Sequence, residues 1–178
     1  IIGSGIAGIS SSLKLKSYGI NSIILDKGNF IGGRISTREV KIGSSSNYFF
    51  HGAQFFTAKT YEFKKIISTG VNGKYIKEFG NFDPKRYRGN KTMREFLLNL
   101  SKELHIQQKV KIIGIKTDNN KIKVLDNKIK EWISYDGVIS TLPAPQNYKL
   151  LKQFHSLQET LNTGSYHACI ALMFTFDK

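Results

Sequence analysis

The chain opens with the stretch Ile1-Ile2-Gly3-Ser4-Gly5-Ile6-Ala7-Gly8. Two apolar residues, the end of a strand, run directly into glycines spaced G-x-G-x-x-G, which is typical of a turn that binds the diphosphate of a dinucleotide. In such a turn Gly3 permits the tight bend, Gly5 leaves room for the phosphates, and Gly8 lets the next helix pack closely on the strand. The stretch therefore predicts a strand-turn-helix unit with a dinucleotide ligand.

The residues that follow support this prediction. A helix should begin near Ile6, with Ile6, Ile9 and Leu13 on the side that faces the sheet. The partial positive charge of its N-terminus favours phosphate. An apolar strand over residues 22–25 then ends at Asp26, where such folds place a carboxylate that accepts hydrogen bonds from the adenosine ribose. The alternative is an ordinary strand-turn-helix unit in which the glycines occur by chance.

Hydrophobic patterning and turn residues predict the remaining elements. The expected helices cover residues 59–67, 92–104 and a stretch ending near 161, with Met93, Phe96 and Leu97 in the core rather than in a cofactor site. The expected loops and turns are a glycine loop over 28–33, a polar turn over 44–47 and an irregular stretch over 73–90 that contains one strand near 75–79. Buried strands are expected over 48–50 and 137–141, and a final strand over 166–176. An antiparallel meander is expected over 110–116, 122–125 and 129–134.

The fold class that these elements predict is α/β. It combines a Rossmann-like domain with a central parallel sheet, an antiparallel β-meander and the start of a mixed α+β substrate domain. The 178 residues begin in mid-strand without Met and stop directly after an apolar run, so we expect a fragment of a longer protein.

The net charge of the chain bears on whether nucleic acid or a membrane is its partner. The chain has 27 basic and 13 acidic residues, a net charge of +14, which raises the question of nucleic acid or an anionic membrane. The basic residues are mostly lysines spread along the chain, without clusters interleaved with aromatic residues, so we expect neither partner. No apolar stretch approaches the roughly 20 residues of a membrane span, and no signal peptide is visible.

Cys169 is the only cysteine, which excludes an internal disulfide and a thiolate metal cluster. Because it lies in the apolar run 168–174, we expect a buried, inert thiol. A reducing cytoplasm fits this cysteine usage. The four histidines show no triad or metal-ligand spacing, and we expect no metal site.

Four segments resemble one family in order and approximate spacing: residues 1–8, Gly32-Gly33-Arg34, His51-Gly52-Ala53-Gln54-Phe55-Phe56-Thr57-Ala58, and Ser140-Thr141-Leu142-Pro143-Ala144-Pro145-Gln146. Together they resemble a renalase-like FAD-dependent oxidoreductase of the amine oxidase superfamily. The first two segments are shared by many flavoproteins of that superfamily, whereas the last two are more particular to the renalase-like branch. The resemblance covers only about the N-terminal half of such proteins.

The resemblance implies a division into domains and a set of cofactor-binding residues. Residues 1–58 and 105–150 would form the FAD-binding domain, and residues 59–104 and 151–178 would be parts of a substrate or cap domain. The implied FAD-binding residues are Gly3, Gly5, Ile6, Ala7, Gly8, Asp26, Lys27, Gly33, Arg34, Arg38, Gly52, Ala53, Gln54, Phe55, Val110, Thr141 and Pro143.

By the same resemblance, the first glycines would cradle the FAD diphosphate, Asp26 would hold the ribose, and Arg34 with Arg38 would neutralise the phosphates. Val110 would lie beside the adenine through its backbone. Residues 52–55 would run past the isoalloxazine ring, and the loop that contains Thr141 and Pro143 would close the cofactor channel. Phe50 departs from the family, because an acidic residue commonly precedes the H-G-A-Q segment.

The implied reaction is oxidation of a reduced dihydronicotinamide dinucleotide by hydride transfer to flavin N5, with O₂ as the electron acceptor. No side chain is identified as catalytic. Gln54 and His51 are the candidates near the flavin, and for His51 a purely structural role is equally open. Two alternatives remain: a flavin amine oxidase or carotene desaturase, and a non-redox nucleotide- or nucleic-acid-binding module.

Overall fold

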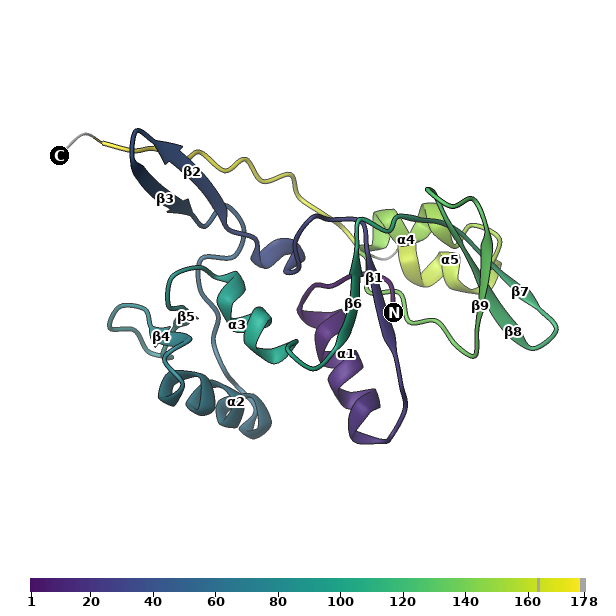
Figure 1. Cartoon of the computed structure of the whole chain (residues 1–178), viewed down its shortest axis with the longest axis horizontal. Coiled ribbons are helices and arrows are strands. Elements are labelled where there is room, and N and C mark those ends of the chain that lie inside the picture. The colour runs from purple at the N-terminus through teal and green to yellow at the C-terminus, as the bar shows by residue number, and fades with distance from the viewer. Residues whose placement is uncertain (163, 177–178) are drawn as a thin grey trace. The chain divides into compact units, whose positions relative to one another are not determined.

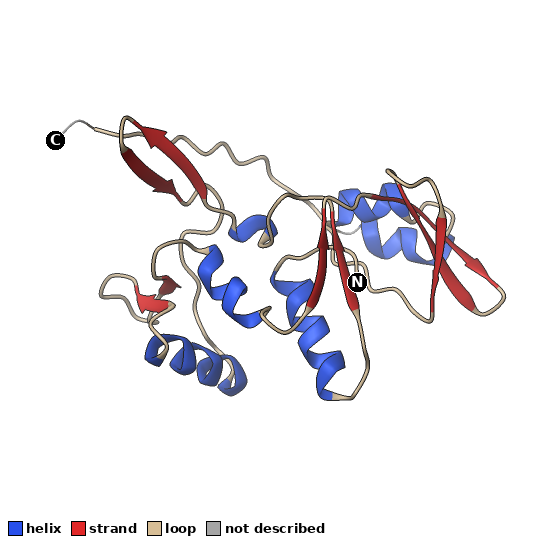
Figure 2. Cartoon of the chain, viewed as in Figure 1, coloured by secondary structure: helices blue, strands red, loops and turns tan. Residues whose placement is uncertain are grey.

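The computed structural model describes residues 1–162 and 164–176. The chain divides into two compact units. The first consists of Ile1–Ile31 and Leu104–Cys169, and the second of Gly32–Glu103 and Ile170–Lys178. Within the described residues, the strands form three two-stranded sheets and one three-stranded sheet (Figure 2).

These units have other bounds than the predicted domains. Residues 32–58 group with the second unit, where the Thr37 Oγ1 atom accepts a hydrogen bond from the Met93 amide at 3.0 Å. Residues 151–169 group with the first unit, where Leu151 and Phe154 pack against its core. The assignment of these segments to a cofactor domain and a substrate domain stays a prediction.

A parallel sheet forms the centre of the first unit. Strand β1 (Ile23–Asp26) pairs in parallel with β6 (His105–Gln108), and the two lie side by side in Figure 1. Ile2 forms one parallel bridge to Leu25 and another to Ser140. The order across the sheet is therefore β6, β1, the segment at Ile2 and the segment at Ser140. The glycine turn directly follows Ile2, so it starts between β1 and the segment at Ser140.

Helix α1 (Ile6–Ser17) begins at the predicted residue, with Gly5 as its N-cap. Its buried residues are Gly8, Ile9 and Ser12; of the predicted stripe, Ile9 is buried, Leu13 is half-buried and Ile6 is exposed. Ile6 is 37% exposed, because the close approach of Gly8 to the preceding strand turns the Gly8–Ser12 side of the helix inward. The Ser12 hydroxyl completes this packing by a 2.8 Å hydrogen bond with the hydroxyl of Ser22.

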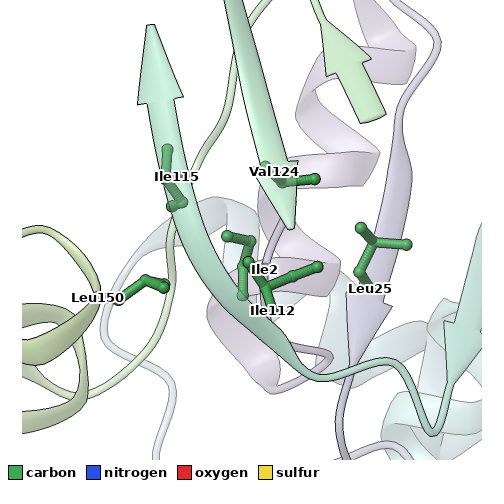
Figure 3. Packing of buried hydrophobic residues seen from close by; sticks show 6 residues of the cluster. All are labelled: Ile2, Leu25, Ile112, Ile115, Val124 and Leu150. Carbon is green, nitrogen blue, oxygen red and sulfur yellow. The ribbon is translucent and has the colours of Figure 1, made fainter. Parts of the chain in front are cut away.

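The predicted meander is confirmed as β7 (Ile112–Asp118), β8 (Lys121–Asp126) and β9 (Trp132–Tyr135), all antiparallel. The first turn uses Asn119 and Asn120, both with positive φ, as tight hairpins require. Helices α4 (Ala144–Leu150) and α5 (His155–Asn162) follow, as the sequence predicts for this stretch. Figure 3 shows how the elements meet in one apolar cluster of Ile2, Leu25, Ile112, Ile115, Val124 and Leu150.

The strands after the meander and before it differ from the prediction. Strand β6 was not predicted, because His105-Ile106-Gln107-Gln108 has a single apolar residue and pairs at one edge of the sheet. Residues 137–141 do not form a buried strand: only Ser140 makes a bridge, and Ile139 is 40% exposed. Among the described residues this segment is bonded on one side only, through Ile2, so the ladder that would bury it is incomplete.

The predicted strand over residues 166–176 is also wrong. These residues have no regular secondary structure, and the side chains of Ile170, Leu172 and Phe174 are 87%, 74% and 69% exposed. High β-propensity does not form a strand without a neighbouring ladder, and no other segment among the described residues supplies one. For the same reason Cys169 is exposed, not buried as predicted.

In the second unit, β2 (Arg38–Ile42) and β3 (Ser45–Phe49) form an antiparallel hairpin. The turn lies at Gly43, with φ of 58°, one residue before the predicted polar turn, so residues 45–47 belong to a strand. Tyr48 is 46% exposed, which contradicts the predicted buried strand over 48–50. Neither β2 nor β3 contains a buried residue, as expected of an isolated two-stranded ribbon.

The predicted helices of this unit are confirmed with other bounds as α2 (Tyr61–Asn72) and α3 (Arg94–Leu100). The Thr60 hydroxyl caps α2 by accepting from the Phe63 amide at 3.3 Å. The stretch predicted as irregular with one strand contains two, β4 (Ile76–Glu78) and β5 (Tyr87–Gly89), paired antiparallel. The core of the unit contains Ile67, Ile76, Met93, Phe96 and Leu97, which confirms the predicted core role of the α3 side chains.

Candidate dinucleotide-binding site

The glycine turn at the start of the first unit is shaped by two close approaches. Gly3 has φ of 103°, a conformation that residues with a side chain rarely adopt. A Cβ atom on Gly8 would lie 1.9 Å from the carbonyl oxygen of Gly3, which no real contact allows. The helix can therefore approach the strand this closely only with glycine at both positions.

Gly5 differs from these two glycines. Its φ of −72° suits any residue, and a Cβ atom placed on it would meet nothing within 4 Å. The packing of the chain therefore does not require glycine here. What glycine provides at this position is open space directly in front of the N-terminus of α1.

The start of α1 presents hydrogen-bond donors to that space. The amides of the first helical turn have no partner within the helix, and no side chain of the described residues caps them. The first turn contains no acidic residue, and Ile6 and Ala7 are exposed. Free amides together with the positive end of the helix dipole suit a phosphate group.

Asp26, at the end of β1, is held by three donors. Its Oδ2 atom accepts from the Ser4 amide at 2.6 Å and from the Ser4 hydroxyl at 2.8 Å, and its Oδ1 atom accepts from the Gly28 amide at 2.6 Å. Since a carboxylate oxygen accepts about two hydrogen bonds, Oδ1 keeps one accepting position for a ligand hydroxyl. Sequence reasoning missed Ser4, although it lies inside the motif and is fully buried.

The other predicted residues of the first unit lie around the same strand ends. The Val110 amide donates to the Asp26 carbonyl at 2.9 Å, and the Val110 side chain packs against the core. The Thr141 hydroxyl donates to the Ile2 carbonyl at 2.9 Å. A Cβ atom added to Gly3 would lie only 2.8 Å from this hydroxyl oxygen. Lys27 is exposed next to Asp26.

Pro143 precedes α4 and is its N-cap. The buried Asn147 fixes the loop before it, because its side-chain amide donates to the Leu142 carbonyl at 2.8 Å. The loop to which the family resemblance assigns the closing of the cofactor channel is therefore held in a defined conformation from within its own unit. The patterning gave no reason to single out Asn147.

The remaining predicted residues lie in the second unit, where two segments meet backbone to backbone. The first is the short helix η1 (Gly33–Ile35), which contains Arg34. The Ala53 amide donates to the Arg34 carbonyl at 2.9 Å, and a Cβ atom on Gly52 would lie 2.1 Å from that oxygen. The structure thus brings together two of the segments that carry the family resemblance.

Several side chains of this group are exposed, among them Arg34, Arg38, His51 and Gln54. The Nε2 atom of His51 lies 2.9 Å from the Ser36 hydroxyl, so the ring orientation is fixed from one side. Phe56 packs in the core with its ring 5.1 Å from that of Phe96, whereas Phe55 is 36% exposed. Of the two phenylalanines, Phe55 is the more exposed.

A half-buried arginine supports the turn before η1. Burial lowers the pKa of Arg94, and its guanidinium donates to the Thr37 carbonyl at 3.0 Å. Its Cγ atom lies 3.6 Å from the position that a Cβ on Gly32 would take. Arg94 and Thr37 are therefore supporting residues that the sequence patterns did not indicate.

No group of three or more His, Cys, Asp or Glu side chains in residues 1–162 and 164–176 is arranged to hold a metal ion. No helix in this part of the chain is both long and apolar enough to cross a bilayer.

Residues 1–67 match the family described as the NAD(P)-binding Rossmann-like domain. With the parallel strand order and the glycine turn, this decides the architecture. The fold is Rossmann-like. It is similar, with a TM-score of 0.65, to the crystal structure of a protein from Exiguobacterium sp. 255-15 assigned as a protoporphyrinogen oxidase. The match covers 85% of this chain at 9% identity, which is a likeness of fold, and the chain spans 60% of the length of that protein.

Proposed function

We propose that the Rossmann-like chain is the dinucleotide-binding part of an FAD-dependent oxidoreductase. The observation that carries the proposal is the contrast among the glycines: packing requires Gly3 and Gly8, whereas Gly5 faces open space in front of free helix amides. That space suits the diphosphate of FAD, and the Asp26 carboxylate, with one accepting position left, suits a ribose hydroxyl.

The residues that would hold FAD divide by chemistry. The amides of Ile6 and Ala7, at the start of α1, would donate to the diphosphate, and Lys27 would add positive charge nearby. Asp26 would accept from the ribose, and the backbone at Val110 would lie beside the adenine. In the second unit the resemblance assigns contacts with the rest of the cofactor to Gly33, Arg34, Arg38, Gly52, Ala53, Gln54 and Phe55.

When bound, the flavin supplies the redox chemistry by accepting a hydride at N5. The chain's own residues bind and orient. Gln54 offers both an amide donor and a carbonyl acceptor from an exposed position, which suits the polar edge of the flavin ring. His51, fixed by Ser36, can donate or accept one hydrogen bond according to its tautomer.

We propose a reduced dihydronicotinamide dinucleotide as the substrate and O₂ as the electron acceptor. The support for this step is the resemblance of residues 51–58 and 140–146 to the renalase-like branch. We further propose a location in the cytoplasm and no nucleic-acid partner, on the composition arguments given for Cys169 and the scattered lysines.

Rapid mixing under anaerobic conditions tests the proposal. The full-length protein, saturated with FAD, is mixed with reduced nicotinamide dinucleotides, including isomers reduced at different ring positions, and separately with primary and secondary amines. We expect the flavin absorbance to be bleached by a dihydronicotinamide and restored by air. Bleaching by amines alone would identify an amine oxidase, and a protein that retains no flavin would refute the FAD proposal altogether.

A further inference from the structure

The short hairpin of β4 and β5 in the second unit (Figure 1) has two chemically different faces. Phe56 and Tyr87 form an antiparallel bridge, and their rings stack at 6.4 Å. Phe56 also packs on Phe63 and Phe96, so this face belongs to the aromatic core of the unit. Because side chains alternate along a strand, the neighbours of Phe56 and Tyr87 point the other way.

Among those neighbours are Phe55, Arg86 and Arg88. The Arg86 guanidinium carbon lies 4.2 Å from the centre of the Phe55 ring and 3.9 Å from that of Phe82. The Phe79 ring stacks with Phe55 at 6.1 Å and with Phe82 at 6.2 Å. We name this set of residues the Arg–Phe face: Phe55, Phe79, Phe82, Arg86 and Arg88.

The two cations of the Arg–Phe face are held by rings and not by carboxylates. The guanidinium of Arg88 lies 5.0 Å from the Phe79 ring, and its buried Nε atom has no hydrogen-bond partner among the described residues. Within residues 1–162 and 164–176, no carboxylate lies within ion-pair distance of either arginine. The nearby acidic Glu78 is paired instead with Lys85 at 2.8 Å.

Such a surface is suited to an anion that also has a flat ring. Aromatic rings hold the guanidinium groups by cation–π attraction and leave their N–H groups to donate. A guanidinium binds phosphate through two parallel hydrogen bonds. The Phe82 ring, 42% exposed, offers stacking area to a base beside those donors.

We propose that the Arg–Phe face binds the adenine and diphosphate half of the dihydronicotinamide substrate, with Arg86 on a phosphate and Phe82 under the base. This inference rests on the proposed function for the identity of the ligand. It assigns substrate recognition to Arg86 and Phe82, neither of which is among the residues proposed to hold FAD.

A calorimetric titration with ADP-ribose tests the proposal, because this probe contains the adenine and diphosphate but has no redox chemistry. The full-length protein is first saturated with FAD, so that the glycine turn is filled. Arg86→Gln is compared with Lys85→Gln, which removes the same charge from the adjacent residue. We expect Arg86→Gln to raise the Kd for ADP-ribose about tenfold or more, and Lys85→Gln to raise it less than about twofold.

Phe82→Leu keeps the charge and removes an exposed ring, so it tests the same site if Arg86→Gln proves unstable, and it should also raise the Kd by about tenfold. Thermal melting followed by circular dichroism checks the folding of each variant. The proposal is overturned if the wild type does not bind ADP-ribose, or if Arg86→Gln and Lys85→Gln have equal effects. Failure of the FAD proposal is seen separately, as a protein that retains no flavin before the titration begins.

Discussion

The two glycines Gly5 and Gly8 should respond in opposite ways to the same substitution. A Cβ atom on Gly8 would lie 1.9 Å from the Gly3 carbonyl oxygen, whereas real Cβ contacts are essentially never shorter than 3.0 Å. The strand and the helix would have to separate by roughly the difference between these two distances. Overpacking of this kind costs about 1–3 kcal/mol.

Gly5→Ala should leave the fold intact. Its φ of −72° suits alanine, and the added methyl group meets nothing within 4 Å. At an N-cap, alanine is less favourable than glycine by roughly 0.5–1 kcal/mol, so the free energy of unfolding should fall by about 1 kcal/mol or less. The methyl group would instead occupy the space that we assign to the diphosphate, and the loss of one charge-assisted hydrogen bond would weaken FAD binding about tenfold or more.

Urea unfolding of the flavin-free, full-length protein gives the first quantity, and titration with FAD gives the second. We expect Gly8→Ala to lower both stability and affinity, and Gly5→Ala to lower affinity alone. A Gly5→Ala variant that binds FAD as tightly as the wild type would refute the assignment of that space. A Gly8→Ala variant as stable as the wild type would refute the packing argument.

Two further predictions concern the first unit. Ile24 is fully buried in β1, so Ile24→Ala should cost about 2–5 kcal/mol in urea unfolding, whereas the control Ile20→Ala, at a residue 51% exposed, should change the stability by less than about 0.5 kcal/mol. The hydrogen bond and charge of Lys123 lower the pKa of Asp118 from its ordinary value of 3.8. The ion pair therefore stabilises the meander fully at pH above 3.8, and this stabilisation is lost as the pH falls through the lowered pKa. Between neutral pH and a pH below 3.8, the urea midpoint of the wild type should therefore fall more than the urea midpoint of Asp118→Asn. If both midpoints fall by the same amount, the ion pair does not contribute as proposed.

The strand-turn-helix unit could be predicted from sequence because its constraints are local. Gly3, Gly8 and the helix start at Ile6 follow from backbone sterics within eight residues, and the structure has them as predicted. The β7–β8–β9 meander was equally accessible, since alternation and asparagine turns act over short distances.

Predictions failed where a partner distant in sequence decides the outcome. Residues 166–176 have the composition of a strand but no ladder among the described residues, and β6 has little apolar character yet pairs with β1. Burial of Cys169 failed for the same reason as the strand around it. β-structure depends on which segments meet, and a propensity pattern does not contain that information.

The candidate site shows the same division. The motif residues were readable from spacing, but the groups that hold them were not: Ser4 on Asp26, Ser36 on His51 and Asn147 on the proline loop. Each is a hydrogen bond whose partner is set by tertiary structure. The sequence patterns also gave no indication of Arg86 and Arg88. Their proposed role depends on the aromatic rings that contact them and on the lack of an ion-pair partner among the described residues, and both are features of tertiary structure.

The central claim is that the glycine turn and the start of α1 bind the diphosphate of FAD. The most direct measurement is titration calorimetry of FAD into the full-length protein after its flavin has been removed. We predict saturable binding that restores a yellow, dialysis-resistant protein. A protein that gives no binding heat with FAD and stays colourless after dialysis would contradict the claim.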